Sequence, residues 1–227
     1  MIQDPDNRYI ATICANCDVD GKDILEIGCG KGRITRDLAK RARRVVATDP
    51  DTAALDIARA TNSAVNIEYV HAPTGVPDLP PATFDVVMYT LSFHHVPEHE
   101  MPASLRAAAK LLRNGGDIVI VEPGDGGSFT ETKERFGAGS GDETPARQAA
   151  ILAMNGFDGW RAGETVHFRT SFTFENDEDF LNSMLPGHLQ QPAGFVEEVR
   201  RFLDQYKTAE GILLHADRRL NVLRQAS

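Results

Sequence analysis

Short apolar runs of strand length alternate with longer segments whose apolar residues follow helical spacing. Four of the short runs, DILEIG, RVVATD, FDVVMYT and DIVIVEP, are almost continuously apolar, as expected for strands that are buried on both faces of a sheet. Strands that alternate with helices are typical of a parallel sheet covered by helices. The pattern predicts an α/β fold with a doubly wound, mostly parallel, seven-stranded sheet.

The expected elements can be placed in chain order. Helices are predicted at 5–17, 32–42, 51–60, 99–113, 143–154, 176–184 and 193–208, and strands at 23–28, 44–49, 66–72, 84–90 and 116–122. Residues 165–174 and the run ILLHADRRLNVLRQ alternate apolar and polar positions. These two strands are expected to pair antiparallel at one sheet edge. The glycine-rich stretch after Pro123 is expected to be a mobile loop carrying short helices.

Length and charge narrow the class of protein. A chain of 227 residues with 41% hydrophobic content can bury one full core, so we expect a single domain. The 33 acidic residues outnumber the 24 lysines and arginines, and a net charge of −9 disfavours nucleic acid as a partner. No apolar run reaches the roughly 18 residues that would cross a bilayer, and the start of the chain does not read as a leader. We therefore expect a cytoplasmic protein without a membrane partner.

The three cysteines fit a reducing compartment, because their number is odd and they cluster within the first thirty residues. Cys14 and Cys17 form a CxxC pair, which is half of a zinc site or a redox pair in some proteins. No second pair follows at a suitable spacing. We interpret both cysteines as small apolar residues on the N-terminal helix.

The sequence DILEIGCGKGRIT carries the clearest chemical signal. A buried strand ends at Glu26 and Ile27, glycines follow at 28, 30 and 32, and a helix begins directly afterwards. Such glycines allow a sharp turn and leave space for a ligand close to the backbone. The dinucleotide fingerprint requires GxGxxG, but this turn is GxGxG, with Arg33 in place of the last glycine. The spacing therefore disfavours NAD.

Asp49 ends the next strand, nineteen residues after Gly30. An acid at this place can accept hydrogen bonds from both ribose hydroxyls of an adenosine. With the glycine turn, it makes residues 20–122 resemble the class I S-adenosylmethionine (SAM)-dependent methyltransferases. The similarity is to the small-molecule branch of methyltransferase types 11 and 25. Past residue 122 only the order of elements is shared.

The resemblance implies a Rossmann-like fold, SAM as cofactor, S-adenosylhomocysteine (SAH) as its product, and a small-molecule acceptor. Glu26 matches the acid that orients the turn and the methionine end of SAM. Asp49 matches the ribose-binding acid, Pro50 would lie against the adenine, and the backbone of Thr90 would face the methionine. Ala72 departs only partly from the family, which often has an aspartate or a short residue near the adenine amine. Ala72 can offer only its backbone there, and whether His71 compensates stays open. The implied cofactor site contains Glu26, Gly28, Cys29, Gly30, Gly32, Asp49, Pro50, Ala72 and Thr90.

A simpler interpretation of these positions is structural. The glycines could serve only packing, and Asp49 could cap the next helix. Asp51 is also a suitable N-cap, which leaves Asp49 available for the ribose.

The loop after the fourth strand contains three of the seven histidines: His94, His95 and His99. Because imidazole titrates near neutrality, His94 or His95 could act as a general base, or both could simply pack beside the cofactor. A metal site is disfavoured, because no carboxylate and histidine spacing completes a known set. The loop lacks the Asn/Asp-Pro-Pro-aromatic motif of enzymes that methylate bases or amide side chains.

Glu122 ends the fifth strand at the same edge of the sheet. Its side chain could meet the acceptor or could simply be solvated.

We assign residues 1–20 to an N-terminal helix, 21–122 to the cofactor-binding core, 123–192 to an acceptor lid, and 193–227 to a helix and edge strand. Aromatic residues of the lid, among them Phe129, Phe136, Phe157 and Trp160, are expected to line the acceptor pocket. For Phe157 and Trp160 the alternative is that they only seal a helix against the sheet. Two alternatives stay open besides a small-molecule methyltransferase. One is a SAM- or NAD-dependent enzyme of another reaction type, and the other is a catalytically silent SAM-binding domain that acts through partners.

Overall fold

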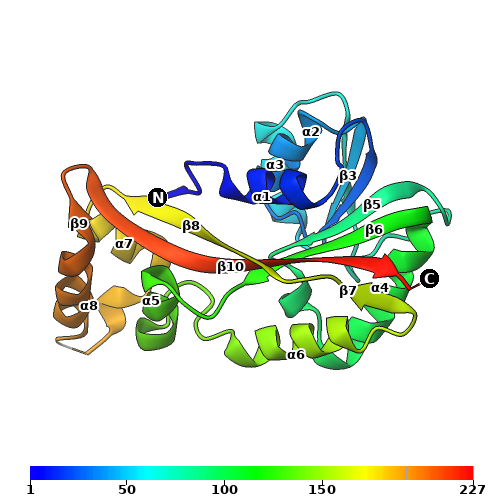
Figure 1. Ribbon diagram of the computed structural model, residues 1–227. Helices are drawn as coiled ribbons and strands as arrows, with labels where there is room; N and C mark the ends of the chain where they lie inside the picture. The colour runs from blue at the N-terminus through cyan, green and yellow to red at the C-terminus, as the bar shows by residue number, and fades with distance from the viewer. Residues whose placement is uncertain (193, 227) are drawn as a thin grey trace. The chain divides into compact units, whose positions relative to one another are not determined.

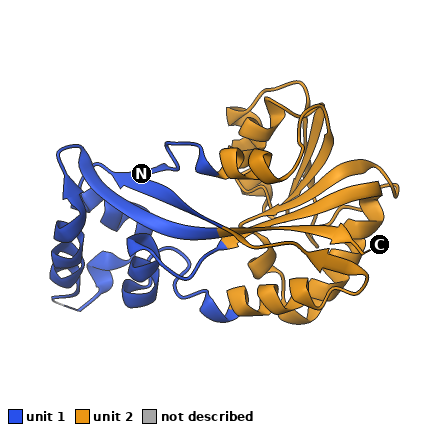
Figure 2. Cartoon of the chain, viewed as in Figure 1, with its two compact units in different colours: residues 1–8, 123–145, 167–218 blue, residues 9–122, 146–166, 219–227 orange. Residues whose placement is uncertain are grey.

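The computed structural model describes residues 1–192 and 194–226, and the chain divides into two compact units (Figures 1 and 2). The larger unit comprises residues 9–122, 146–166 and 219–227, and the smaller comprises 1–8, 123–145 and 167–218. Strand β10 (Gly211–Gln225) begins in the smaller unit and ends in the larger. The expected assignments of one domain and an acceptor lid stay predictions.

The larger unit is built on a parallel sheet. Its strands β2 (Asp23–Ile27), β3 (Arg44–Asp49), β4 (Ile67–His71), β5 (Phe84–Thr90) and β6 (Leu112–Pro123) lie in the order β6-β5-β2-β3-β4. All four neighbouring pairs of this series are parallel. The chain first adds β3 and β4 on one side of β2 and then crosses to the other side of β2, where it adds β5 and β6. Ligands bind at such a change of direction in open α/β sheets, beyond the carboxyl ends of the strands.

Helices cover both faces of this sheet (Figure 1). One face packs against α4 (Met101–Leu111) and α6 (Thr144–Asn155), with Leu25 and Ile27 from β2 in the shared core. The other face carries α1 (Arg8–Asn16), α2 (Arg33–Ala39) and α3 (Thr52–Thr61). Because side chains alternate across a strand, Glu26 points to the opposite face from its neighbours, toward Thr35 of α2.

The smaller unit has its own hydrophobic core. The order β1-β8-β10 joins β1 (Ile2–Gln3) and β8 (Val166–Phe174) to the first part of β10, and the short β9 (Lys207–Thr208) also pairs with β10. The helices are α5 (Ser128–Phe136), α7 (Asp177–Met184) and α8 (Phe195–Leu203). Phe129 of α5 stacks on Phe172 of β8, with ring centroids 3.7 Å apart.

The predicted α/β class and its mostly parallel sheet are confirmed. Among the described residues, seven strands have five or more residues, as many as were predicted: β2 to β6, β8 and β10. The structure also contains three short strands that were not predicted, β1, β7 (Trp160–Ala162) and β9. Two or three residues are too few to show alternation, which explains why the sequence did not reveal these three strands. The helix expected at 193–208 is shorter than predicted: α8 begins at Phe195, after a left-handed Gly194, and ends at Leu203. A 3₁₀ turn at Asp204–Tyr206 and the strand β9 follow it, and residue 193 lies outside the described residues.

The antiparallel pairing of β8 with β10 is also confirmed. Arg169, Thr170 and Ser171 contact Asp217, Ala216 and His215 in turn, so the two strands run in opposite directions. β1 pairs with β8 as well, so β8 has a neighbour on each side.

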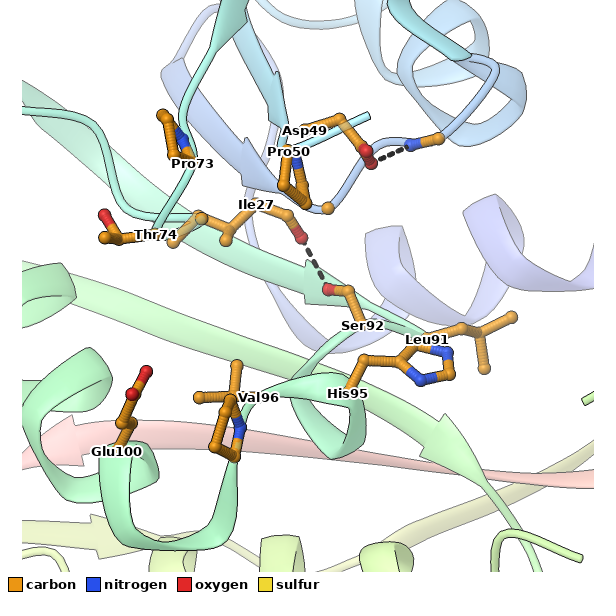
Figure 3. Close-up of a pocket in the computed structure, with 14 residues that line it drawn as sticks. Ile27, Asp49, Pro50, Pro73, Thr74, Leu91, Ser92, His95, Val96 and Glu100 are labelled. Atoms are coloured by element: carbon orange, nitrogen blue, oxygen red, sulfur yellow. Dashed lines mark hydrogen bonds between the residues drawn. The ribbon is translucent and has the colours of Figure 1, made fainter. Parts of the chain in front are cut away.

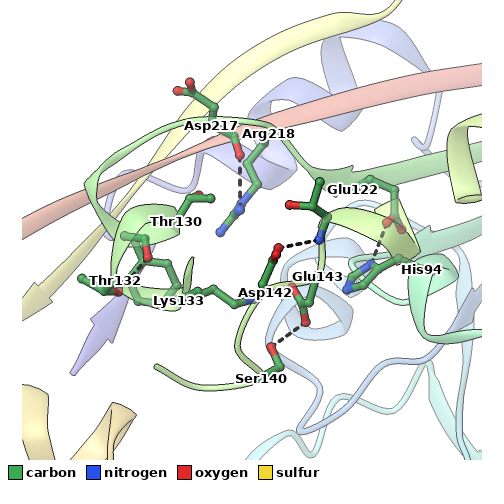
Figure 4. A network of polar contacts seen from close by, with 12 residues as sticks. His94, Glu122, Thr130, Thr132, Lys133, Ser140, Asp142, Glu143, Asp217 and Arg218 are labelled. Atoms are coloured by element: carbon green, nitrogen blue, oxygen red, sulfur yellow. Dashed lines mark hydrogen bonds and ion pairs between the residues drawn. The ribbon is translucent and has the colours of Figure 1, made fainter. Parts of the chain in front are cut away.

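The stretch after Pro123 is more regular than its composition predicted. It contains α5, whose Phe129 and Phe136 are buried in the core of the smaller unit. An ion pair between Lys133 and Glu143, and a hydrogen bond from Ser140 to Glu143, join α5 to the segment that follows it (Figure 4). No helix among the described residues is long and apolar enough to span a membrane.

Candidate functional site

A cavity of about 580 Å³ lies in the larger unit at the carboxyl ends of β2, β3 and β5 (Figure 3). This is the edge of the sheet at which the chain changes direction. The lining residues come from the glycine turn, the ends of β3 and β4, and the loop after β5. They are Ile27, Gly28, Gly30, Asp49, Pro50, Pro73, Thr74, Gly75, Leu91, Ser92, His95, Val96, Pro97 and Glu100.

The three glycines of the turn all have positive φ, but their surroundings differ. A Cβ on Gly28 would lie 2.3 Å from the Cβ of Ser92, and one on Gly32 would lie 2.6 Å from the Tyr69 hydroxyl. A Cβ on Gly30 would have no heavy atom within 4 Å. Gly28 is therefore required by the packing of the protein, and Gly32 by its left-handed backbone, since the nearest atoms to its added Cβ are the ends of the Tyr69 and Asn62 side chains. Gly30 is the position that leaves space for a ligand.

Asp49 is buried and holds the turn in place. Its Oδ2 accepts a hydrogen bond from the backbone N–H of Gly30 at 2.7 Å, and its Oδ1 accepts one from Asp51 at 2.9 Å. The helix cap is a different residue, because the side chain of Asp51 accepts from the N–H groups of Ala53 and Ala54. Asp49 therefore does not cap α3, and a carboxylate oxygen has lone pairs for further donors.

Glu26 lies beneath the turn and is fully buried. Its oxygens accept hydrogen bonds from the hydroxyls of Thr35 at 2.5 Å and Thr90 at 2.6 Å. Burial raises the pKa of the Glu26 carboxyl above its ordinary value, and the two threonine hydroxyls partly oppose this. Glu26 thus connects the turn to α2 and to the end of β5.

The raised pKa of Glu26 leads to a testable effect on stability. A carboxyl whose pKa is higher in the folded state contributes most below its unfolded pKa, near 4.5, and this contribution is lost as the pH rises through the folded pKa. In the parent chain, ionisation of Glu26 lowers the unfolding free energy as the pH rises from 4.5 toward neutrality. We expect this decrease to be smaller in the Glu26→Gln variant. Each tenfold difference in proton affinity between the folded and unfolded states corresponds to about 1.4 kcal/mol. Urea titrations of the parent and the variant at several pH values would measure the unfolding free energy. The same pH dependence in both proteins would contradict the prediction.

The loop after β5 is held close to the glycine turn. Leu91 has a left-handed backbone, with φ 62°, and its N–H donates to Val121. The Ser92 hydroxyl donates to the carbonyl oxygen of Ile27 at 2.5 Å (Figure 3). A non-glycine residue with positive φ is uncommon and is often found at functional sites.

The tandem histidines have different environments. His94 is buried, and its Nδ1 lies 2.6 Å from Oε2 of Glu122 (Figure 4). The backbone N–H of Phe93 donates to the other oxygen of Glu122 at 3.1 Å. His95 is exposed and lines the cavity, with its ring centroid 4.0 Å from that of His94. Glu122 is therefore not solvated, since it supports the loop through His94.

The cavity brings together some of the predicted site residues. Gly28, Gly30, Asp49, Pro50 and His95 line it. Glu26, Cys29, Gly32, Ala72, Thr90 and His94 are not among its fourteen lining residues. The sequence interpretation did not identify Thr74, Gly75, Ser92 or Glu100 as lining residues. The positions of Thr74, Gly75 and Ser92 shortly after predicted strands were a usable signal, but Glu100 falls within the helix predicted at 99–113.

The cysteines fit a structural interpretation. Cys14 lies on α1 and Cys17 directly follows it. Burial, with a contribution from nearby Asp117, raises the pKa of Cys17 to about 12. Burial also raises the pKa of Cys29, which lies within the glycine turn. Thiols with raised pKa values are poor nucleophiles and poor metal ligands at neutral pH.

Comparisons with known proteins find similarity to methyltransferases. A family described as "Methyltransferase domain" matches residues 24–116. A ubiquinone biosynthesis O-methyltransferase of Idiomarina loihiensis is 37% identical over 101 residues, which are 43% of this chain and 41% of that protein. An uncharacterized methyltransferase of Mycobacterium bovis is 29% identical over 114 residues, which are 50% of this chain and 57% of that protein. The chain thus spans about half the length of these relatives.

Similarity of fold extends further along the chain. A putative methyltransferase from Bacillus halodurans has a TM-score of 0.63 and 16% identity, and the alignment covers 97% of this chain and 100% of the other. At this identity the similarity concerns the fold alone.

Proposed function

We propose, from the match of residues 24–116 to a methyltransferase domain and from the residues that line the 580 Å³ cavity, that this chain is a class I SAM-dependent methyltransferase, which binds SAM in this cavity and transfers its methyl group to a small-molecule acceptor. The observation that carries the proposal is that Asp49 and Gly30 line the same cavity and are joined by a hydrogen bond. An acid and an open glycine are thus placed together where a nucleoside can approach both.

The residues of the cavity fit the chemistry of SAM. Ligand cavities usually measure about 300 to 1,000 Å³, and this one lies within that range. Asp49 would accept hydrogen bonds from the ribose hydroxyls, and Gly30 would allow the ligand to pass close to the backbone. The lining contains two carboxylates, Asp49 and Glu100, and no lysine or arginine. This suits a ligand that carries a sulfonium and an ammonium group.

Bound SAM would supply an electrophilic methyl group: a nucleophilic atom of the acceptor would bond to the methyl carbon in line with the carbon–sulfur bond, which would break and release SAH. The protein has mainly to align donor and acceptor and to exclude water. The Ser92 to Ile27 hydrogen bond holds the two loops of the cavity together, and Glu26 anchors the turn through Thr35 and Thr90. We assign these residues a positioning role.

The acceptor is proposed to be a small molecule. The small-molecule branch that the sequence resembles supports this, and the name of the Idiomarina relative makes hydroxyl acceptors the first class to test. The acceptor pocket is proposed to involve residues 123–192. Phe129 and Phe136 do not line an open pocket, however, because they are buried in the core of the smaller unit, and Phe157 is buried in the core of the larger unit.

His95 is the histidine that we propose as general base. His94 is engaged by Glu122, but His95 lines the cavity. For a hydroxyl acceptor we expect His95→Gln to lower kcat about 100-fold or more, because a general base typically contributes 10² to 10⁴ in rate. The dissociation constant for SAH should stay within threefold. Steady-state kinetics with calorimetry would measure both, and turnover within threefold of the parent would leave His95 as a packing residue.

The test of the function uses isotope-labelled SAM. The purified chain is incubated with metabolite extracts, and mass spectrometry follows transfer of the label to small molecules. Calorimetry in a metal-free buffer should show binding of both SAM and SAH. Binding of NAD with no binding of SAM or SAH would overturn the proposal.

A further inference from the structure

The cavity has apolar walls on two opposite sides. Ile27, Pro50 and Pro73 lie on one side, and Val96 lies on the other (Figure 3). Glu100 lies on the same side as Val96, with its carboxylate directed toward the cavity. The two sides leave a slot with an acidic group at its edge.

A slot of this kind suits a flat heterocycle that carries a hydrogen-bond donor. Apolar side chains pack against the faces of a ring, and a polar group at the edge determines which ring is accepted. The adenine of SAM has apolar faces and an exocyclic amine, which is a donor. The amine requires an acceptor on the protein, because an unpaired donor in a binding site lowers affinity.

The side chain at the position where the sequence placed this acceptor does not provide one. Ala72 has no polar side-chain atom, is 4% exposed and does not line the cavity. Asp49, which accepts from Gly30 and Asp51 at the end of β3, is the acid proposed for the ribose hydroxyls. Glu100 is the second carboxylate of the lining, and it comes from a different element, the 3₁₀ turn Glu98–Glu100.

We propose that Glu100 determines specificity for adenine, with its carboxylate accepting a hydrogen bond from the exocyclic amine of the cofactor. This inference rests on the proposed function. It gives the cavity one acid for the ribose, Asp49, and another for the base, Glu100.

Glu100 has a second role in the fold, which provides a control. It directly precedes α4, where an acidic side chain stabilises the positive end of the helix. Glu98 lies in the same turn and is also exposed, but it does not line the cavity. Glu98→Ala should therefore reproduce any general effect of removing a negative charge near the start of α4.

The experiment compares two ligands by calorimetry. One is SAH, and the other is its purine analogue, in which a hydrogen atom replaces the exocyclic amine. We expect the parent chain to bind SAH about tenfold more tightly than the analogue, which corresponds to 1.4 kcal/mol. Glu100→Ala should reduce this ratio to threefold or less, and Glu98→Ala should leave it at the parent value.

The outcomes distinguish the role of Glu100 in adenine recognition from the proposed binding of SAM. A Glu100→Ala variant that keeps the parent's ratio, or a parent chain that binds both ligands equally, would overturn the role of Glu100 and leave SAM binding intact. Failure of the parent to bind SAH would overturn the proposed function together with this inference. Melting curves of the variants verify that each is folded.

Discussion

An Asp49→Ala variant is expected to bind SAH about 100 to 10,000 times more weakly than the parent chain. The substitution removes the charged acceptor for two ribose hydroxyls, and each such bond is worth about 1.5 to 3 kcal/mol. It also removes the acceptor of the Gly30 N–H at 2.7 Å, so the turn loses a contact that holds it open. Calorimetric titration with SAH would measure the loss.

Asp51 offers a matched control for Asp49. It is an acid two residues further on, and it caps α3 by accepting from Ala53 and Ala54, but it does not line the cavity. Asp51→Ala should lower the unfolding free energy by about 1 kcal/mol, as the loss of an N-cap does, and leave SAH binding within threefold. Equal losses of affinity in the two variants would show that Asp49 acts through the local fold and not through the ligand.

A Gly28→Ala variant is expected to lose about 3 kcal/mol or more of unfolding free energy. Gly28 has φ 75°, and an added Cβ would lie 2.3 Å from the Cβ of Ser92. A left-handed backbone costs an alanine about 1 to 2 kcal/mol, and overpacking costs about 1 to 3 kcal/mol more. Since domains are stable by only about 5 to 15 kcal/mol, urea denaturation would resolve the change readily.

Two further variants test the reason for this loss. Gly30→Ala has the backbone cost without the clash, because nothing lies within 4 Å of its Cβ, so it should lose less stability than Gly28→Ala. In a Ser92→Gly background the Cβ that meets Gly28 is absent, and Gly28→Ala should there cost about 1 to 3 kcal/mol less than in the parent chain. Additive effects of Gly28→Ala and Ser92→Gly would contradict a direct contact between these residues.

Much of the larger unit could be predicted from local patterns. The apolar runs are buried strands because a parallel sheet covered on both faces requires continuous hydrophobicity. The glycines at 28, 30 and 32 adopt positive φ, as a tight turn requires. Asp49 ends β3 and lines the same cavity as Gly30. These features depend on residues close together in the chain or on the order of elements, and both are visible in a sequence.

The smaller unit was harder to predict. Its segments come from three separate parts of the chain, and α5 lies in a stretch whose glycines, serines and charges resemble those of a loop. Phe129 is buried because it stacks on Phe172 of β8, more than forty residues later. Local composition carries no information about a partner at that separation.

By itself, the sequence determined the order of the longer strands and helices of the larger unit, the glycine turn and the acid that follows it. Only the tertiary structure decided that Gly28 faces Ser92, that His94 contacts Glu122, and that the adjacent His95 lines the cavity. Ser92 bonds to Ile27 across 65 positions of the chain, and His94 contacts Glu122 across 28. The physical reason is that such contacts are set by the register and packing of neighbouring strands. Periodicity predicts that a strand exists, but not which side chains it places against its neighbours.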